Sequence, residues 1–246
     1  RNTENIPMEG IDTIIHLANI ANDPTGDLNS KLTWEVNALA SKLLVEKAIN
    51  CCVKQFIFAS SGSVYGVKEE MNVTEDLTLM PISDYNKSKM ISERVLLSYQ
   101  DKIFLQIVRP ATVCGYSPRM RLDLSVNMLT MQALKNGKIK VFGGQQTRPN
   151  IHMNDMVNVY LHFLKLGEKS TGIYNAGFEN ISIIDIAKKI ITKIPAEIVI
   201  TESNDPRSYR QDSTKLLSTG FSPKYSVDDG IDDVIKVYED RKLNDS

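Results

Sequence analysis

Three short apolar segments, separated by helical segments, constrain the fold of this chain most. "IDTIIHLA" (11–18), "QFIFASS" (55–61) and "IFLQIVRP" (103–110) are rich in β-branched and aromatic residues, which is typical of buried strands. Between them, apolar residues recur at helical spacing within 33–49 and 85–99. Since strands joined through helices run parallel, the sequence predicts an α/β fold built on a parallel sheet.

The second half of the chain has a different pattern. After Pro110, a loop rich in Gly, Ser, Pro and Arg ("CGYSPRMR") leads to segments that predict a smaller α/β lobe. Ser182 and Ser226 each precede an Asp by three residues and are expected to begin helices, whereas Asp155 is interpreted as a helix cap. The other expected elements are a helix at 124–136, a strand at "KIKVFGG", a helix from Asp155 and a strand at "GIYNAG".

The composition fits a globular protein and excludes several classes. A formal net charge of −1 gives no basic surface for nucleic acid, and no apolar run approaches the ~18 residues that span a membrane. Three cysteines are too few for a disulfide framework, and His152 and His162 lack the spacing of zinc ligands. We expect a soluble, cytoplasmic protein without a bound metal.

A glycine-rich turn is missing from the sequence. A parallel sheet that binds a nucleotide normally begins with a strand, a glycine-rich turn and a helix, because backbone amides at the helix start hold the pyrophosphate. No such glycine cluster occurs here, and the first strand begins at about residue 11. We expect that a segment on the order of 60 residues precedes this sequence in the intact protein, at ~30 residues for each strand–helix pair. The alternative is a protein that lacks the turn.

Tyr85 and Lys89 in "SDYNKSKM" are four residues apart, so they share one face of the expected helix, with Cβ atoms ~5–6 Å apart. Spacing alone does not assign a function, because Tyr238 and Lys242 show the same pattern. That second pair lies in a charged terminal helix with no serine-ended strand before it, and we interpret it as a chance match.

Serines at a strand end distinguish the first pair. "ASSGSVYG" (59–66) follows a predicted strand, and parallel sheets carry functional groups at the carboxyl ends of their strands. A lysine ammonium beside Tyr85 would favour phenolate, so we expect the pKa of Tyr85 to be lowered. A serine hydroxyl can hold the substrate oxygen whose proton the tyrosine takes. These groups predict proton removal from an alcohol, coupled to hydride transfer to a nicotinamide. His16, within an apolar strand, is interpreted as a core residue.

Eight motifs in order carry a resemblance to a known family. They are "IDTIIHLANIAND", "EVNALASKLLVEKA", "FIFASSGSVYG", "YNKSK", "RPATVCG", "RPNIHMNDMV", "IYNAG" and "DPRSYRQDSTK". Together they resemble the extended short-chain dehydrogenase/reductase family, specifically its NAD-dependent nucleotide-sugar epimerases and dehydratases.

The resemblance implies a Rossmann-type doubly wound sheet with a smaller C-terminal substrate lobe. The dinucleotide-binding domain would comprise 1–112, with 150–176 returning to it, and the substrate-binding lobe would comprise 113–149 and 177–246. The resemblance also implies a homodimer, formed through helices such as 33–49 and 85–99.

The same resemblance implies roles for individual residues. Ser61 would be the catalytic serine, Tyr85 the acid/base, and Lys89 its modulator and a ribose contact. Contacts to NAD would come from Ala18, Asn19, Asn37, Ser60, Tyr85, Lys89, Pro110 and Ala111. Contacts to the nucleotide sugar would come from Ser61, Gly62, Ser63, Thr112, Arg148 and Arg207. Thr112 stands where many members have an asparagine, and the two arginines match residues that clamp the diphosphate.

The positions after Ser61 bear on the reaction. Family dehydratases usually carry Asp or Glu in the one or two positions after the catalytic Ser/Thr, whereas this chain has Gly62 and Ser63. We therefore expect an NAD-dependent 4-epimerase of a UDP-, GDP- or dTDP-linked sugar. The alternatives are a C4 dehydrogenase or ketoreductase, a dehydratase, and a non-catalytic NAD(P)-binding regulatory protein. "GYSPRMRLDL" resembles bacterial members that build sugars for surface polysaccharides.

Overall fold

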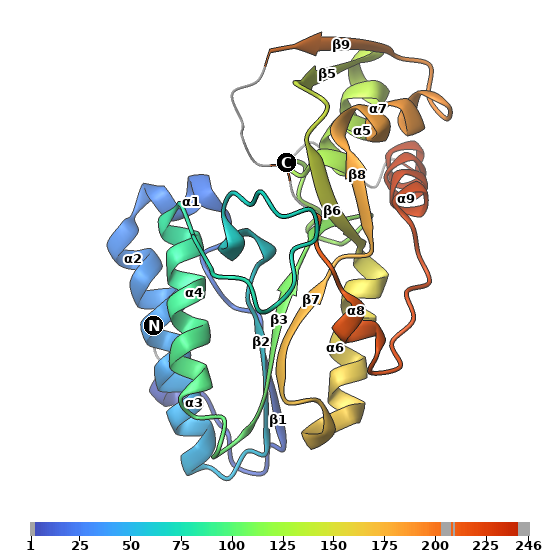
Figure 1. Ribbon diagram of the computed structural model, residues 1–246. Helices are drawn as coiled ribbons and strands as arrows, with labels where there is room; N and C mark the ends of the chain where they lie inside the picture. Colours follow the sequence, from blue (N-terminus) through green and yellow to red (C-terminus); the bar gives the residue numbers. More distant parts are fainter. Residues whose placement is uncertain (1–2, 203–207, 209, 241–246) are drawn as a thin grey trace.

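A four-stranded parallel sheet is the centre of the structure, a computed structural model that describes residues 3–202, 208 and 210–240 (Figure 1). Its strand order is β1-β2-β3-β7, with a crossover connection between each pair of neighbours. The strands are β1 (Thr13–His16), β2 (Gln55–Ala59), β3 (Phe104–Pro110) and β7 (Gly172–Ala176). The predicted parallel α/β sheet is confirmed.

Helices cover the two faces of this sheet, as Figure 1 shows. Successive side chains of a strand point to opposite faces. Phe56 and Phe58 of β2 pack in a core with α3 and α4, whereas Ile57 packs with Val159 and Phe163 of α6 on the other face. On the first face the chain runs through α1 (Asp23–Leu28), α2 (Ser30–Trp34), a π-helical turn (Glu35–Leu39), α3 (Ala40–Asn50) and α4 (Asp84–Leu97). The second face carries α6 (Met153–Leu166).

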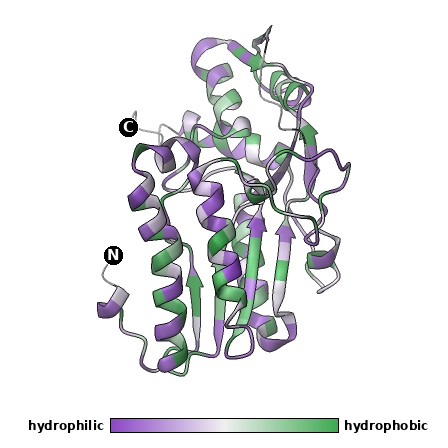
Figure 2. Cartoon of the chain, turned by 60° about the vertical axis from the view of Figure 1, so that its left-hand side comes forward, coloured by the Kyte–Doolittle hydropathy of each residue, from purple (hydrophilic) through white to green (hydrophobic). Residues whose placement is uncertain are grey.

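The smaller lobe has its own sheets and its own core. One sheet has the order β4-β6-β8, and β5 pairs with β9 in parallel. The strands are β4 (Thr112–Cys114), β5 (Lys138–Phe142), β6 (Thr147–His152), β8 (Glu179–Ser182) and β9 (Glu197–Thr201). The helices of this lobe are α5 (Ser125–Asn136), α7 (Ile183–Ile191) and α9 (Val227–Glu239). The short helix α8 (Thr214–Leu217) packs on the main sheet, beside β7. Figure 2 shows the main-sheet strands mostly in hydrophobic colours, with hydrophilic colours on the helices around them.

Two helices begin at the predicted capping residue, and one does not. Ser182 caps α7, and Ser226 forms a full capping box with Asp229 at α9. The interpretation of Asp155 as a cap is wrong, because His152 caps α6. Asp155 is fully buried, and its carboxylate accepts the backbone N–H groups of Lys224 and Tyr225 at 3.0 and 2.9 Å. It fixes the loop before α9 instead.

An apolar surface borders β1. Ile15 is paired in register with Ile57, so both side chains face the α6 side of the sheet. Ile15 and Leu17 are nevertheless 36% and 50% exposed. On α6, Val157 and Leu161 are also exposed. Within the described ranges, no helix has both the length and the apolar character needed to cross a membrane.

Candidate active site

Ser61 and Tyr85 meet at the carboxyl end of β2. Ser61 follows this strand in an extended conformation and caps a short 3₁₀ helix, accepting the N–H of Ser63 at 3.2 Å. Tyr85 lies in the first turn of α4, which Ser83 caps by accepting the N–H of Asn86 at 3.2 Å. Ser61 and Tyr85 line the same cavity, and Ser61 acts to lower the pKa of the phenol. A strand end and a helix start therefore place a hydroxyl and a phenol side by side.

Lys89 lies one turn further along α4, and its side chain is 1% exposed. Its Nζ donates to the carbonyl of Ala59 at 2.7 Å and lies 4.8 Å from the centre of the Phe58 ring. Burial lowers the pKa of Lys89 to about 7, and the negative charge of Glu93 opposes that shift. The ammonium is therefore held against the end of β2.

The electrostatics of Tyr85 differ from the expectation. Burial raises the pKa of Tyr85, and nearby Asp23 acts in the same direction. The hydrogen bond from Ser61 and the charge of Arg121 lower it, but only in part. The expectation that Lys89 lowers the pKa of Tyr85 is therefore wrong in this structure. The cation with that effect is Arg121, from the loop between β4 and α5.

A cavity of about 670 Å³ opens beside these residues. It is lined at the sheet end by Ser60, Ser61, Ser63, Tyr85, Pro110, Ala111 and Thr112, and from the lobe by Gly115, Ser117, Arg119, Met120, Arg121, Asp123, Asn127 and Arg148. Arg148 and Thr112 also border an adjoining hollow of about 320 Å³. The structure thus brings together most of the residues expected to bind substrate. Arg207 lies outside the described residues.

Three of the expected cofactor residues lie at two depths: Ala18 and Asn19 are in the loop after β1, and Asn37 is buried behind that loop. Ala18 is exposed and Asn19 half-buried in the loop after β1. The Asn19 amide nitrogen donates to the carbonyl of Leu17 at 2.7 Å, while its buried Oδ1 has no hydrogen-bond partner within the part of the chain that the structure describes. Asn37 lies behind this loop: its Oδ1 accepts the N–H of Ile20 at 2.8 Å and its Nδ2 donates to the Ile20 carbonyl at 3.0 Å. Asn37 therefore fixes the loop and is itself 1% exposed.

A buried ion pair, which the sequence interpretation missed, lies directly behind the site. Arg109 of β3 contacts both carboxylate oxygens of Glu93, at 3.0 and 2.7 Å. The Ser60 hydroxyl donates to the same carboxylate. The signal that could have identified Glu93 is its position four residues after Lys89, on the same helix face.

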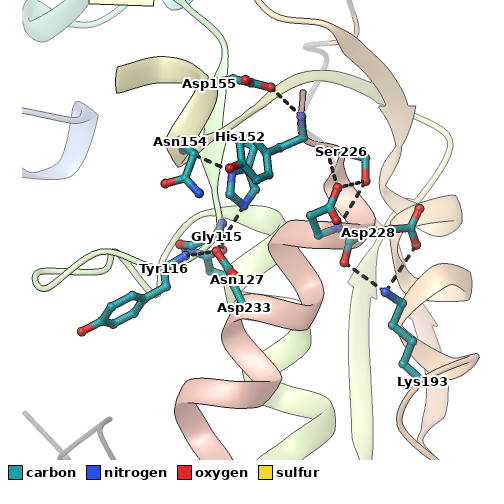
Figure 3. A network of polar contacts seen from close by, with 12 residues as sticks. Gly115, Tyr116, Asn127, His152, Asn154, Asp155, Lys193, Ser226, Asp228 and Asp233 are labelled. Atoms are coloured by element: carbon teal, nitrogen blue, oxygen red, sulfur yellow. Dashed lines mark hydrogen bonds and ion pairs between the residues drawn. The ribbon is translucent and has the colours of Figure 1, made fainter. Parts of the chain in front are cut away.

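A second missed network anchors the lobe side of the cavity (Figure 3). His152 stacks on Tyr225 and its Nε2 lies 3.2 Å from a carboxylate oxygen of Asp233, on α9. The same oxygen accepts the N–H of Tyr116 at 3.3 Å. A Cβ at Gly115 would lie 2.7 Å from His152 Nε2, so glycine lets the chain pass this close. The turn that begins the Arg121 loop is therefore fixed from three elements.

Several known proteins are similar to this chain. UDP-glucose 4-epimerase of Lactobacillus helveticus is 26% identical over 253 residues, covering 92% of this chain and 76% of that protein. Human dTDP-D-glucose 4,6-dehydratase is 27% identical over 251 residues, covering 96% of this chain and 71% of the relative. Among solved structures, UDP-glucuronic acid 4-epimerase from Bacillus cereus, in complex with UDP-glucuronic acid and NAD, superposes with a TM-score of 0.84 at 26% identity. That superposition covers 98% of this chain and 81% of the other.

The match to a family covers the sheet and the site together. Residues 1–177, more than half of the chain, match the NAD dependent epimerase/dehydratase family. This range contains Ser61, Tyr85 and Lys89, as well as all four strands of the main sheet. The relatives named above are enzymes of both kinds, epimerases and dehydratases. The chain belongs to the NAD dependent epimerase/dehydratase family.

Proposed function

We propose that this chain acts as an NAD-dependent nucleotide-sugar 4-epimerase. The observation that carries the proposal is the placement of Ser61 and Tyr85 together on the wall of a cavity of about 670 Å³. Gly62 and Ser63, the two residues after Ser61, supply no carboxylate. Family membership and the similarity to 4-epimerases support the same reaction.

Tyr85 is the proposed acid/base. Its phenolic oxygen takes the proton of the sugar C4 hydroxyl during oxidation and returns a proton to the C4 oxygen on reduction. Ser61, in contact with Tyr85, holds the same C4 oxygen in line. The charge of Arg121 compensates the negative charge that develops on the tyrosine. None of these residues forms a covalent bond to the sugar.

The chain fits the nicotinamide end of NAD. Pro110 and Ala111 line the cavity next to Tyr85, and the buried, unpartnered Oδ1 of Asn19 offers an acceptor at the loop after β1. Lys89 and Ser60 complete the proposed set, with Ala18 beside them. When bound, NAD supplies a carbon that accepts a hydride from sugar C4 and can return it. The 246 residues contain no glycine-rich turn of the kind that holds a pyrophosphate.

The substrate is the proposed occupant of the lobe side. Arg148 and Thr112 border both hollows and are the proposed contacts to the diphosphate, with Arg207 as a further expected contact. Epimerisation requires the 4-keto sugar to present its other face before reduction. A cavity of about 670 Å³ is within the ~300–1,000 Å³ of small-molecule sites, so it can hold a sugar that turns.

Asp23 favours a second candidate, a dehydratase. Its carboxylate lines the cavity and acts electrostatically on Tyr85, so it could deliver the proton that a departing hydroxyl needs. Asp23 also accepts a hydrogen bond from Ser83 at 2.6 Å, which fixes it at the start of α4. The products distinguish the two reactions, because only the dehydratase forms a 4-keto-6-deoxy sugar.

The test of this proposal is product analysis with UDP-, GDP- and dTDP-hexoses in the presence of NAD. The 4-epimer is the expected product by NMR. Tyr85→Phe is expected to lower the rate ~10²–10⁴-fold, the usual contribution of a general acid/base. Tyr238→Phe, the chance match to the pattern, is the control and should leave the rate unchanged. Net NADH, or a stable keto sugar without an epimer, would refute the epimerase. An unchanged Tyr85→Phe rate would refute Tyr85 as the acid/base, and no turnover of any of these sugars would indicate a non-catalytic protein.

We also propose a homodimer formed through α3 and α4. Leu39 and Leu43, one turn apart on the outer side of this helical layer, are 50% and 39% exposed. Two copies that pair these faces would remove both leucines from water.

A further inference from the structure

The hollow of about 320 Å³ adjoins the larger cavity on the side of α4. Four residues border both spaces: Asp23, Ser63, Thr112 and Arg148. Ser83 and Asn86, from the start of α4, line the hollow as well. A molecule bound in the cavity can therefore extend into the hollow.

Ser63 joins the hollow to the proposed catalytic serine. Its hydroxyl lies 2.7 Å from the hydroxyl of Ser61, and its N–H donates to the Ser61 oxygen at 3.2 Å. In the proposed function, Ser61 holds the C4 oxygen of the sugar. A group on a carbon next to C4 therefore comes close to Ser63 and to the hollow that Ser63 borders.

The C6 group is the part of a hexose that suits this separate space. Of the two carbons next to C4, C3 carries a hydroxyl directly on the ring, whereas C5 carries the exocyclic carbon C6. This arm extends one bond further from the ring than a ring hydroxyl does. It can therefore leave the cavity that holds the ring and enter the hollow.

Asn86 offers an unused donor at this place. It follows Tyr85 on α4 and is 4% exposed. Its Oδ1 accepts the hydroxyl of Ser63, and its backbone N–H donates to the Ser83 hydroxyl at 3.2 Å. Its Nδ2 has no hydrogen-bond partner among the residues that the structure describes. Since buried polar groups are normally paired, a nearly buried amide with a free N–H group indicates a ligand oxygen in the hollow.

The charges around the hollow favour a neutral ligand group. Among the described residues that line it, Asp23 and Arg148 carry opposite charges and the others carry none. A second anion would face the Asp23 carboxylate, and Arg148 is already a proposed contact to the diphosphate. A hydroxyl group avoids this repulsion, and its oxygen accepts a hydrogen bond from an amide N–H.

We propose that this hollow binds the C6 hydroxymethyl group of a neutral hexose, and that Asn86 is a specificity-determining residue whose Nδ2 donates to the C6 oxygen. The inference rests on the proposed function, because the place of C4 defines where C6 lies. The contact belongs to the orientation in which the substrate first binds, since turning the ring carries C6 away.

Paired ligands test this site without turnover. The Tyr85→Phe protein is titrated by calorimetry, with NAD present, using UDP-glucose and UDP-6-deoxyglucose, which differ only in the C6 oxygen. Loss of this oxygen leaves Nδ2 without a partner, so Kd is expected to rise about tenfold. The corresponding dTDP-glucose and GDP-mannose pairs are measured in the same way. UDP-glucuronic acid, whose C6 is a carboxylate, should bind about tenfold more weakly than UDP-glucose.

Asn86→Asp is the matched variant, because its carboxylate keeps an acceptor for Ser63 and replaces the Nδ2 donor. It should bind both members of each pair with the same Kd. The added charge acts on both members alike, so it cancels in their ratio. Asn86→Ala, which adds no charge, should lose the ratio too. Lys87→Ala, at the next and exposed position of α4, is the control and should keep it.

The outcomes separate the site from the proposed function. No binding, or equal Kd values within every pair, would overturn the site, and a ratio that persists in both Asn86 variants would overturn the role of Asn86. Tighter binding of UDP-glucuronic acid than of UDP-glucose would overturn the neutral occupant. A tenfold ratio in a protein that forms no epimer would support the site and refute the epimerase. Epimer formation with equal Kd values would do the reverse.

Discussion

Replacing the buried Lys89 by methionine should stabilise the folded chain and abolish its activity. Burial lowers the pKa of Lys89 from 10.5 to about 7, so the folded state disfavours the ammonium that the unfolded chain carries. Methionine has a similar length and fills the same space without a charge. The site would then keep its packing but lose Lys89 as a proposed contact to NAD.

The size of the expected stabilisation follows from the pKa shift of Lys89. A difference of about 3.5 pH units, from 10.5 to about 7, corresponds to roughly 4–5 kcal/mol at ~1.36 kcal/mol per unit. The free-energy cost of burying Lys89 is complete below its pKa in the folded state. The cost disappears as pH rises toward 10.5, because only there does Lys89 lose its proton in both the folded and the unfolded state. Loss of the hydrogen bond to Ala59 and of the contact with Phe58 offsets about 1–2 kcal/mol. We expect Lys89→Met to be about 2–4 kcal/mol more stable near pH 7.

Urea denaturation of Lys89→Met and of the parent protein, from pH 6.5 to 9.5, measures this difference. Their gap should shrink by up to ~1.4 kcal/mol for each pH unit above 7. Lys87→Met is the matched control, since Lys87 lies on the same helix but is exposed, and its gap should stay near zero. A Lys89→Met protein that is no more stable than the parent at pH 7, or a gap independent of pH, would refute the reasoning.

Three other changes test the neighbouring assignments. Burial lowers the pKa of His16 to about 4, so the folded state resists protonation of this ring. The free energy of unfolding should therefore fall by up to about 3 kcal/mol as the pH drops from 6.5 toward 4. His16→Gln should lack this dependence in urea melts at several pH values. Leu39→Glu with Leu43→Glu should convert a dimer to a monomer in sedimentation velocity, and a parent monomer would contradict the proposed interface. Asp233→Ala removes the acceptor that the Tyr116 N–H and His152 share. KM for the nucleotide sugar should then rise about tenfold, while the melting midpoint should change little.

Periodicity predicted the main sheet because its signals are local. The segments that form β2 and β3 are mainly apolar runs. The helices before and after β2 show helical spacing of their core residues. β6 was missed because "TRPNIH" is polar and contains Pro149, and its strand form depends on pairing with β4 and β8. β8 ("ENIS") is short and polar, so it too lacks a clear pattern. β9 ("EIVIT") does carry a run of β-branched residues that indicates a strand, and it was overlooked.

The candidate site was predictable where its residues share one element. Tyr85 and Lys89 are joined by helical spacing, and Ser61 by its place at a strand end. The pKa of Tyr85 was not predictable in this way, because its sign depends on burial and on Arg121, which comes from a loop 36 positions later in the numbering (121 − 85). Spacing along a helix gives the proximity of two groups but not the dielectric around them.

The dependence of Tyr85 on Arg121 links the chemistry to the lobe. Burial alone would keep the phenol protonated, and the groups that oppose it are Ser61, from the main sheet, and Arg121, from the loop after β4. That loop begins at a turn fixed by Asp233 of α9, and Arg121 is itself paired with Asp123 at 2.6 Å. The sheet half alone would therefore hold a complete Ser–Tyr–Lys set with a poor base. The base strength of Tyr85 and the wall of the cavity therefore depend on one segment, the loop that carries Arg121.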